Sequence, residues 1–470
     1  MPAADQQQMG GSGDNRPIRI PLATDIRNRG ENAGIDGRLV NAYVEKVGED
    51  YWIYKRPGLT RYSTNPGGPA PGLGIFNWQG DIYSIFGTAI YKNNVLLAGS
   101  IDGSSSYTFS SILGANPTLF FHNATHAYLY NSGSGVQAVA GGIPASMVPG
   151  QAYLDATTYV VTPGAVVQGS GLNDVTTWPA LNNLIAQIEP DQAMAVAKQL
   201  VYVVVFKQWS TEMFYDAGNA TGSPLGPVQG QKLNFGIRHA NTLGMISGVL
   251  LWVNAIREGG MAVVLMDQLS AQPISSPNVD RILQSTDFTL PVYSWTARVD
   301  GHMFYAVTLT SPNLTLVYDL KQQVWHEWTD TNGNYMPIVS STYVGSSSLL
   351  QHATNGIIYT LDTQNGTDDG AMITSDIYTP PWEAGTRKRK TIGRMRVVGD
   401  QTAGNVLQIR VSDDDYQTFS NFRAVDLSLR DPFLSACGTF RRRVWHIRHT
   451  APIPGRLLMA LEPEIETGTA

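Results

Sequence analysis

An acidic segment near the C-terminal end holds the residues best suited to chemistry. Residues 412–419 read Ser-Asp-Asp-Asp-Tyr-Gln-Thr-Phe. Three consecutive carboxylates could bind calcium, but no glycine or distant glutamate stands at EF-hand spacing. The other interpretation is a hairpin turn in which an aspartate side chain accepts hydrogen bonds from backbone amides. We favour the turn, with calcium as the alternative, and assign to it Ser412, Asp414, Thr418 and Phe419.

The same segment resembles an Asp-box, the pattern Ser-x-Asp-x-Gly-x-Thr-Trp/Phe that recurs in sialidases. Tyr416 stands at the position of the glycine, which departs from the pattern. Residues 18–21, Ile-Arg-Ile-Pro, are similar to a second sialidase segment, although Ile18 replaces its aromatic residue. Glycoside hydrolysis also requires a positioned acid and nucleophile, and the sequence identifies no such pair. A secreted glycan-active or glycan-binding β-propeller is therefore the alternative hypothesis.

Other signatures of catalysis or cofactor binding do not occur in the sequence. His122 and His126 are four residues apart, but their surroundings alternate like a strand, so they would not share a helical face for a metal. The sequence contains no glycine-rich phosphate loop and no nucleophile elbow. Cys437 is the single cysteine, so neither a disulfide nor a cysteine metal cluster can form within one chain. We predict a protein that is not an enzyme and uses no cofactor or metal.

The composition is typical of an all-β protein. Charged residues make up 15% of the 470 residues, against a usual quarter, while 10% are aromatic. The 47 glycines and 26 prolines suit many short strands joined by tight turns, because glycine adopts positive φ and proline fixes turn starts. No signal peptide or apolar stretch of membrane-spanning length is evident. We therefore expect that the chain assembles in a cytoplasm and does not insert into a membrane.

A strand–turn–strand theme recurs along most of the chain. It appears in residues 75–91, 119–130, 153–161, 201–214, 248–254, 303–328 and 347–361. The spacing, roughly 40 to 50 residues, is that of β-propeller blades. The clearest copy, residues 314–328, contains Tyr318, Asp319 and Trp325, and large flat side chains of this kind fill the space between blades. Residues 178–197 and 279–285 have helical periodicity and predict short helices inserted between blades.

Changes in composition divide the chain into four parts. Residues 1–35 are polar and glycine-rich and predict a flexible arm. Residues 36–55 form strands that we expect to join a platform with residues 376–470, a C-terminal antiparallel β domain. Residues 56–375 are expected to form the β-propeller.

Two basic clusters stand out in a chain of net charge −6. They consist of Arg387, Lys388, Arg389 and Lys390, and of Arg441, Arg442, Arg443 and Arg448. A solvated strand is the simplest interpretation, docking of an acidic protein partner is the next, and DNA phosphates are the least favoured. An acidic protein has no overall attraction for phosphates, whereas a localised basic patch suits a neighbouring subunit.

Taken in order, several segments resemble the packaged-DNA stabilisation protein, or tail hub (nozzle), of short-tailed bacteriophages (podoviruses). The similar segments are residues 56–62, 201–237, 298–325, 409–419 and 441–448. The resemblance spans most of the chain from about residue 40. It rests on the order of these segments and on the total length of the chain, since no single motif is specific. The residues that match its blade motifs are Ser210, Glu212, Tyr215, Tyr318, Asp319 and Trp325.

This resemblance implies a structural virion protein, assembled in the host cytoplasm and located in the phage tail. It implies a homo-oligomer, expected to be a hexameric ring, that continues the DNA exit channel below the portal and its ring adaptor. The ring would retain packaged DNA before ejection, and genomic DNA would pass through it without sequence recognition. Its further partners would be a tailspike or tail fibre and a tail needle or plug. The resemblance supplies no catalytic residues.

Overall fold

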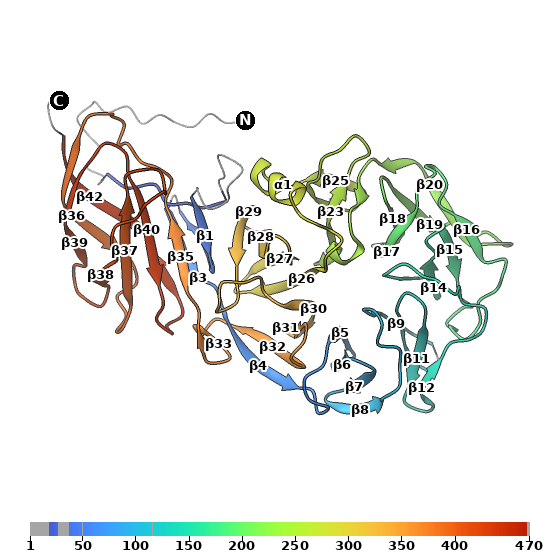
Figure 1. The fold of residues 1–470 in the computed structure, drawn as a ribbon. Helices are drawn as coiled ribbons and strands as arrows, with labels where there is room; N and C mark the ends of the chain where they lie inside the picture. The colour runs from blue at the N-terminus through green and yellow to red at the C-terminus, as the bar shows by residue number, and fades with distance from the viewer. Residues whose placement is uncertain (1–17, 27–36, 49, 115, 468–470) are drawn as a thin grey trace. The chain divides into compact units, whose positions relative to one another are not determined.

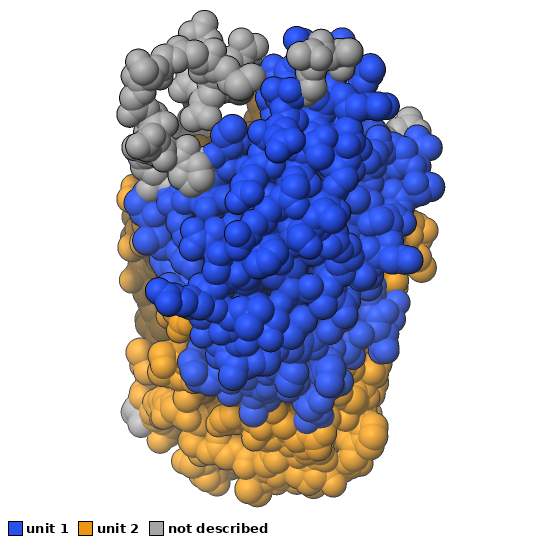
Figure 2. Space-filling model, turned by 90° about the vertical axis from the view of Figure 1, so that its left-hand side faces the viewer, with its two compact units in different colours: residues 1–60, 316–334, 362–470 blue, residues 61–315, 335–361 orange. Residues whose placement is uncertain are grey.

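The computed structural model describes residues 18–26, 37–48, 50–114 and 116–467. Its regular elements are strands, apart from one α-helix, α1 (Pro277–Gln284), and one 3-10 helix, η1 (Ala240–Thr242). The all-β prediction is therefore confirmed. No helix within these ranges is long and apolar enough to cross a membrane. The chain forms two compact units, coloured separately in Figure 2: unit 1 (residues 1–60, 316–334 and 362–470) and unit 2 (residues 61–315 and 335–361).

Unit 2 is a succession of small antiparallel sheets around a common centre (Figure 1). The first two are β5(Gly72–Trp78)-β6(Asp81–Phe86)-β7(Ala89–Lys92)-β8(Val95–Ala98) and β9(Thr108–Ile112)-β10(Thr118–His122)-β11(Ala127–Asn131)-β12(Gly135–Ala138). The next two are β13(Ala152–Leu154)-β14(Thr157–Val161)-β15(Val166–Gly169)-β16(Asn183–Ile185) and β17(Ala193–Gln199)-β18(Tyr202–Lys207)-β19(Thr211–Asp216)-β20(Leu225–Leu233). Then follow β21(Gly236–Ile237)-β23(Val249–Ala255)-β24(Val263–Asp267)-β25(Ser270–Pro273), with β22(Gly244–Ile246) on β23, and the pair β26(Val292–Val299)-β27(His302–Leu309). Each sheet is built from neighbouring segments, which is the local pairing typical of propeller blades.

The last sheet of unit 2 joins the two ends of the succession. Its order is β30(Ile338–Val344)-β31(Ser347–His352)-β32(Ile357–Asp362)-β4(Gly58–Thr64), so its outer strand comes from the beginning of the unit. The amide of Asn65 donates to the carbonyl of Gly356 over 2.7 Å beside this pairing. Gly356 has a φ of +72°, and a Cβ there would lie 2.6 Å from the carbonyl oxygen of Gly68. Only glycine fits this close approach of two backbones.

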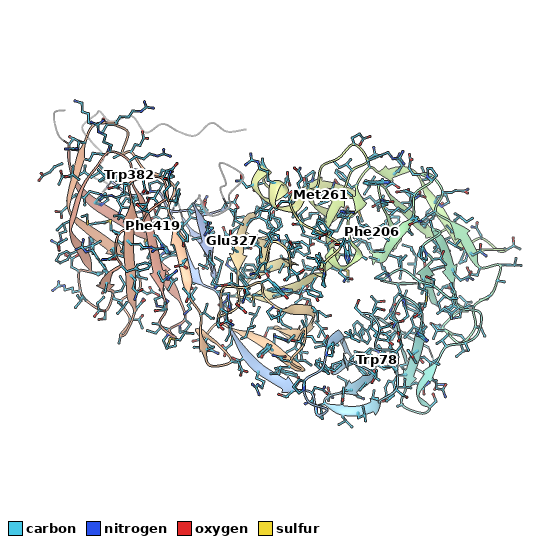
Figure 3. All side chains as sticks on the ribbon, in the orientation of Figure 1. Trp78, Phe206, Met261, Glu327, Trp382 and Phe419 are labelled. Carbon is cyan, nitrogen blue, oxygen red and sulfur yellow. The ribbon has the colours of Figure 1, made fainter. Side chains whose placement is uncertain are left out.

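Aromatic side chains pack between consecutive sheets of unit 2, as the sequence predicted. Tyr83 of β6 lies 5.7 Å from Tyr130 of β11, measured between ring centroids. Phe206 of β18, labelled in Figure 3, lies 4.9 Å from Trp252 of β23 in an edge-to-face arrangement. Such pairs bury large apolar areas in fixed geometry. These rings therefore help to hold neighbouring sheets together, while aliphatic side chains such as Val161 and Val205 fill the core between β13–β16 and β17–β20.

Unit 1 contains one long sheet and two three-stranded sheets. Strand β28(Leu314–Asp319) enters the unit, and the long sheet continues β29(Val324–Trp328)-β1(Arg38–Val40)-β35(Ser375–Tyr378)-β40(Val444–His449)-β37(Val406–Ser412)-β38(Arg423–Asp426). The smaller sheets are β39(Phe433–Phe440)-β36(Lys390–Val398)-β42(Ala460–Thr467) and β2(Ala42–Val47)-β3(Asp50–Lys55)-β41(Arg456–Leu458), and β33(Thr367–Asp368) pairs with β34(Ala371–Met372). Apolar residues of all three sheets share one buried core, which includes Leu39, Ile53, Ile392 and Ile447.

Part of the expected N-terminal arm packs on unit 1. Residues 1–17 and 27–35 lie outside the described residues, but residues 18–26 are described. Ile20 is buried in the core of unit 1, and its amide donates to the carbonyl of Leu461 over 2.9 Å. Asp25 accepts a hydrogen bond from the amide of Trp325. Residues 18–26 are therefore part of the fold and not of a flexible arm.

One of the two predicted helices is wrong. Helix α1 confirms the periodicity of residues 279–285, but residues 178–197 form β16, the beginning of β17 and the loops beside them. Trp178 is buried there, 5.9 Å from Phe120 of the preceding sheet, and Ala193 and Ala195 face the interior. Burial against two neighbouring sheets produced an apolar spacing that imitates a helix. The domain boundaries near residues 35, 55 and 375 stay predictions.

A fully buried guanidinium joins the three sequence segments of unit 1. Arg56 donates to Asp368 over 2.9 and 2.5 Å, to Asn41 Oδ1 over 2.9 Å and to the carbonyl of Thr329 over 2.9 Å. Its fourth acceptor is the carbonyl of Pro57. The sequence predicted only a turn at Arg56, because Thr329 and Asp368 lie more than 270 residues away along the chain. The planar donors of arginine match several acceptors at once.

Replacing Arg56 tests this junction. Arg56→Met leaves the carboxylate of Asp368 and the side chain of Asn41 without their buried partner, so we expect the free energy of unfolding to fall by about 3–5 kcal/mol. Arg56→Lys should recover only part of this loss, since an ammonium lacks the planar fork. Urea unfolding measures both. The control is Arg394→Met, which removes an exposed pair with Asp431 and should change stability by about 1 kcal/mol or less.

Burial also makes unit 1 sensitive to acid. His449 of β40 is 1% exposed, neither ring nitrogen has a hydrogen-bond partner among the described residues, and burial, with a smaller contribution from Lys55, lowers its pKa from 6.5 to about 4. An unfolded histidine takes up a proton below pH 6.5, whereas the folded one does so only near pH 4. The free energy of unfolding should therefore decrease as the pH falls from 6.5 to 4, and His449 should account for about 3 kcal/mol of this decrease.

The variant His449→Gln isolates that contribution. Between pH 6.5 and 4 its free energy of unfolding should fall less steeply than that of the unmodified protein, because the glutamine cannot titrate. Urea unfolding at pH 7, 6, 5 and 4 gives the two slopes. Equal slopes would show that His449 has the same pKa in the folded and the unfolded protein.

Candidate functional site

A buried ionic network lies between β18 and β19 of unit 2. Strand β18 ends at Lys207, whose ammonium lies 2.9 Å from Asp191 and 2.7 Å from Glu212 of β19. The side chain of Lys207 is fully buried, and those of Asp191 and Glu212 are 3% and 1% exposed. Removing charges from water costs several kcal/mol per ion, so such a group is stable only when each charge is paired and hydrogen-bonded.

The remaining bonds of the network fix two loops. The carboxylate of Asp191 accepts the amide of Trp209 over 2.7 Å and both the amide and the hydroxyl of Ser210. Glu212 Oε1 accepts the amides of Ile188 and Glu189 over 3.0 and 3.3 Å. Lys207 also donates to the carbonyls of Ala186 and Glu189. The three charges therefore hold the loops at residues 186–191 and 208–210 in place.

A polar cavity of about 200 Å³ lies beside these loops, and we call it the Trp209 pocket. Its lining residues are Glu189, Trp209, Ser210, Lys232, Asn234, Ile256, Arg257 and Glu258. Glu189 pairs with Lys232 over 2.6 Å and with Arg257 over 3.7 Å. The hydrogen bond from Lys232 lowers the pKa of Glu189. Two cations and two carboxylates give the lining no net charge.

The structure brings some of the predicted blade residues together and separates others. Ser210 and Glu212 both belong to the buried network, whereas Tyr215 is 42% exposed and lines a second cavity of about 350 Å³ with Tyr202, Asp155 and Asp216. Lys207 and Asp191 were not predicted from the sequence. The sequence did contain one signal for the buried network: Lys207 comes directly after the apolar run of residues 203–206. A lysine at the end of so apolar a strand indicates a buried cation that needs acidic partners.

The other predicted blade residues lie in unit 1. Tyr318 of β28 and Trp325 of β29 pack with ring centroids 5.0 Å apart. The fully buried Asp319 accepts the amide of Lys321 over 2.9 Å and so closes the turn between the strands. These residues shape a hairpin and leave no reactive group exposed at it.

The structure places the acidic segment in a tight turn after β37. Asp414 accepts hydrogen bonds from the hydroxyl of Ser412 over 2.7 Å and from the amide and hydroxyl of Thr418. The bonds from Thr418 are the main reason that the pKa of Asp414 falls to about 2. Within the described residues, no group of three or more His, Cys, Asp or Glu side chains is placed to hold a metal.

Two features near this turn were not expected from the sequence. Tyr416 replaces the glycine of an Asp-box and still adopts a φ of +69°, because its ring is buried and its hydroxyl donates to the carbonyl of Thr379 over 2.7 Å. Phe419 (Figure 3) lies half-buried with its ring 5.7 Å from His446, and the guanidinium of Arg410 lies 4.5 Å above it.

The predicted docking clusters divide into paired and exposed residues. Arg443 is buried and bidentate with Asp413 over 2.6 and 2.7 Å, and Arg448 is bidentate with Asp376 over 2.7 and 3.0 Å. Lys390 is buried and donates to backbone carbonyls, and Arg442 lies 3.5 Å from Asp415. The exposed members of the two clusters are Arg387, Lys388, Arg389 and Arg441.

These contacts narrow the docking prediction. A buried arginine that already forms two short bonds to a carboxylate cannot reach a partner without breaking them. Arg443 and Lys390 are therefore structural, contrary to their assignment as docking residues. The fold places Asp413 from the turn after β37 next to Arg443, and the loop before β36 turns the carbonyls of Thr386 and Lys388 toward Lys390.

Replacing Lys207 tests the network. Lys207→Met leaves two buried carboxylates without their cation, so we expect the free energy of unfolding to fall by about 3–5 kcal/mol. Lys92→Met is the matched control in unit 2, since Lys92 forms a 2.8 Å pair with Asp81 in which both side chains are about one-third exposed. The control should lose about 1 kcal/mol or less in the same urea unfolding experiment. Equal losses would mean that the network is not a stabilising element.

Comparisons with known proteins place the fold. A protein-family model described as "Bacteriophage P22 Gp10, beta-propeller" matches residues 36–365. No curated protein matches the chain. Solved structures that match the chain include the Neurospora crassa Pan2 WD40 domain (10% identity, 67% of this chain and 97% of that chain, TM-score 0.39). Others are the N-terminal domain of Nup159 (10%, 70% and 99%, TM-score 0.39) and the computationally designed Ika8 protein (10%, 62% and 96%, TM-score 0.37).

Proposed function

The chain belongs to the bacteriophage P22 Gp10 β-propeller family, and from that premise we propose that it is a tail hub, or nozzle, subunit of a short-tailed phage. The family is that of a phage structural protein, so the chain is a virion component. The proposal adds a homo-oligomeric ring, expected to be a hexamer, that continues the DNA exit channel. The secreted sialidase-like protein considered from the sequence is no longer our proposal.

The observation that carries this proposal is the extent of the family match. It covers residues 36–365, which include every sheet of unit 2 and the first strands of unit 1. The buried charges support a structural role as well. Arg56 and Lys207, one buried cation in each unit, are saturated by internal acceptors and offer no free reactive group.

The exposed basic residues of unit 1 support a docking role. Arg387, Lys388 and Arg389 form one exposed loop before β36, in a protein whose net charge is negative. A local patch of opposite sign favours a specific acidic protein surface and accelerates its association. We assign this loop to the contact with the portal–adaptor ring, and leave the tailspike or fibre and the tail needle to other surfaces. Genomic DNA would pass through the ring without sequence recognition.

Assembly with the neighbouring virion proteins tests the function. Light scattering of the purified chain, alone and mixed with the adaptor ring encoded in the same phage genome, should show a ring or assembly into one on mixing. Arg387→Glu/Arg389→Glu should weaken adaptor binding by about tenfold, equivalent to about 1.4 kcal/mol. Lys46→Glu/Lys198→Glu changes the net charge equally at exposed positions elsewhere and should bind normally.

Two results would count against the proposal. A chain that stays monomeric with the adaptor and the portal present has no hub function. A loss of binding that is equal in both charge-reversal variants would leave the hub in place but remove the loop of residues 387–389 as its contact.

A further inference from the structure

The buried carboxylates of Asp191 and Glu212 hold the backbone of several residues that line the Trp209 pocket. Asp191 holds the backbone of Trp209 and Ser210, and Glu212 holds the backbone of Glu189 on the other wall. Both carboxylates meet at the ammonium of Lys207, and all three groups are at least nine-tenths buried. Preorganised walls reduce the ordering that a ligand must impose when it binds.

A close backbone contact fixes Trp209 further. A Cβ on Gly236 would lie 2.2 Å from the carbonyl oxygen of Gln208 and 2.5 Å from the Cα of Trp209. The chain after β20 therefore packs directly against the turn that carries the indole. Trp209 itself is half-buried, so part of its ring faces the pocket, with the aliphatic side chain of Ile256 among the other lining groups.

The polar lining has donors and acceptors in balance. Glu189 and Glu258 supply carboxylate acceptors, and Lys232 and Arg257 supply cationic donors. Asn234, which is exposed, supplies one acceptor and two donors from its amide. Because Glu189 pairs with both cations, the pocket has no unneutralised positive charge to attract a phosphate. Six of its eight lining residues carry a charge, an amide or a hydroxyl group. An apolar side chain would leave these polar groups without hydrogen-bond partners, so the pocket does not suit one.

We propose that the Trp209 pocket binds one ring of a neutral saccharide. A hydroxyl group both donates and accepts hydrogen bonds, which suits a lining of mixed carboxylate, amide and cationic groups. The C–H face of a sugar ring would pack on the indole, since tryptophan presents an apolar surface with a polar edge. A volume of about 200 Å³ is below that of pockets for drug-sized ligands and suits a single ring. This activity would be additional to the proposed hub function, and it requires no reaction.

Ligand-observed NMR on the full-length protein tests the proposal. The probes are the methyl glycosides of glucose, galactose, mannose and N-acetylglucosamine, together with N-acetylneuraminic acid as an acidic sugar. At least one neutral glycoside should bind saturably with a Kd of about 1 mM, the affinity expected of a small, shallowly bound ligand. It should bind more tightly than the acid, because the pocket has no free cation.

Two variants assign that binding to the pocket. Trp209→Ala and Asn234→Ala should each weaken it at least about tenfold, which corresponds to 1.4 kcal/mol. Trp52→Phe is the matched control, since Trp52 is a half-buried tryptophan of β3 in unit 1 and should leave binding unchanged. Circular dichroism and urea unfolding of each variant confirm that the fold is retained, and Asn234→Ala, at an exposed position, keeps the test decisive if Trp209→Ala fails to fold.

The proposal is overturned if no neutral glycoside binds saturably up to about 50 mM, far above the expected Kd. It is equally overturned if binding survives both Trp209→Ala and Asn234→Ala, or if only the acidic sugar binds. None of these results affects the hub function, which rests on the family match and on assembly with the adaptor.

Discussion

The guanidinium of Arg56 is the interaction on which unit 1 depends. Unit 1 consists of three segments that are far apart in the sequence, and this one cation is bonded to residues of all three through Asn41, Thr329 and Asp368. A buried charge tolerates little misplacement, because each lost acceptor leaves an unpaired group in a medium of low dielectric. The three segments must therefore reach one arrangement together. In the core of the same unit, the half-buried Trp382 (Figure 3) packs against Phe440 and Trp445, with ring centroids 6.3 and 5.7 Å away.

In unit 2, the buried charge of Lys207 also requires its acceptors to be accurately placed, but it joins fewer segments than Arg56 does. The sheets of unit 2 are held together by apolar side chains, aromatic and aliphatic, whereas the network of Lys207 fixes its loops through charged hydrogen bonds. Hydrogen bonds to charged groups are shorter and stronger than neutral ones, and they fix direction as well as distance. The loops at residues 186–191 and 208–210 are thus strictly positioned. The saccharide site that we infer lies at these loops because a binding site requires that rigidity.

The sequence predicted local features well and distant ones poorly. The hairpin of residues 314–328, helix α1 and the aromatic packing between blades follow from patterns of a few residues, and they are confirmed. The helix expected at residues 178–197 was wrong because burial on two sides imitates helical spacing. Lys390 was expected to bind a partner, but it is buried against the carbonyls of Thr386 and Lys388. Arg443 was also expected to bind a partner, but its carboxylate Asp413 comes from a segment 30 residues away that no local pattern reveals. Lys207 and Asp191 were missed for the same reason, as their contact across 16 residues depends on where two loops meet.

The strand that completes the last sheet of unit 2 has a consequence for biosynthesis. Strand β4 emerges early from the ribosome, yet its neighbour β32 follows almost 300 residues later. At about 5–20 residues per second, β4 waits tens of seconds with an unsatisfied edge while the intervening sheets form from local pairings. Pairing across so long an intervening chain is entropically slow. The nascent protein is therefore exposed to edge-to-edge aggregation at β4 until β32 has emerged from the ribosome and paired with it.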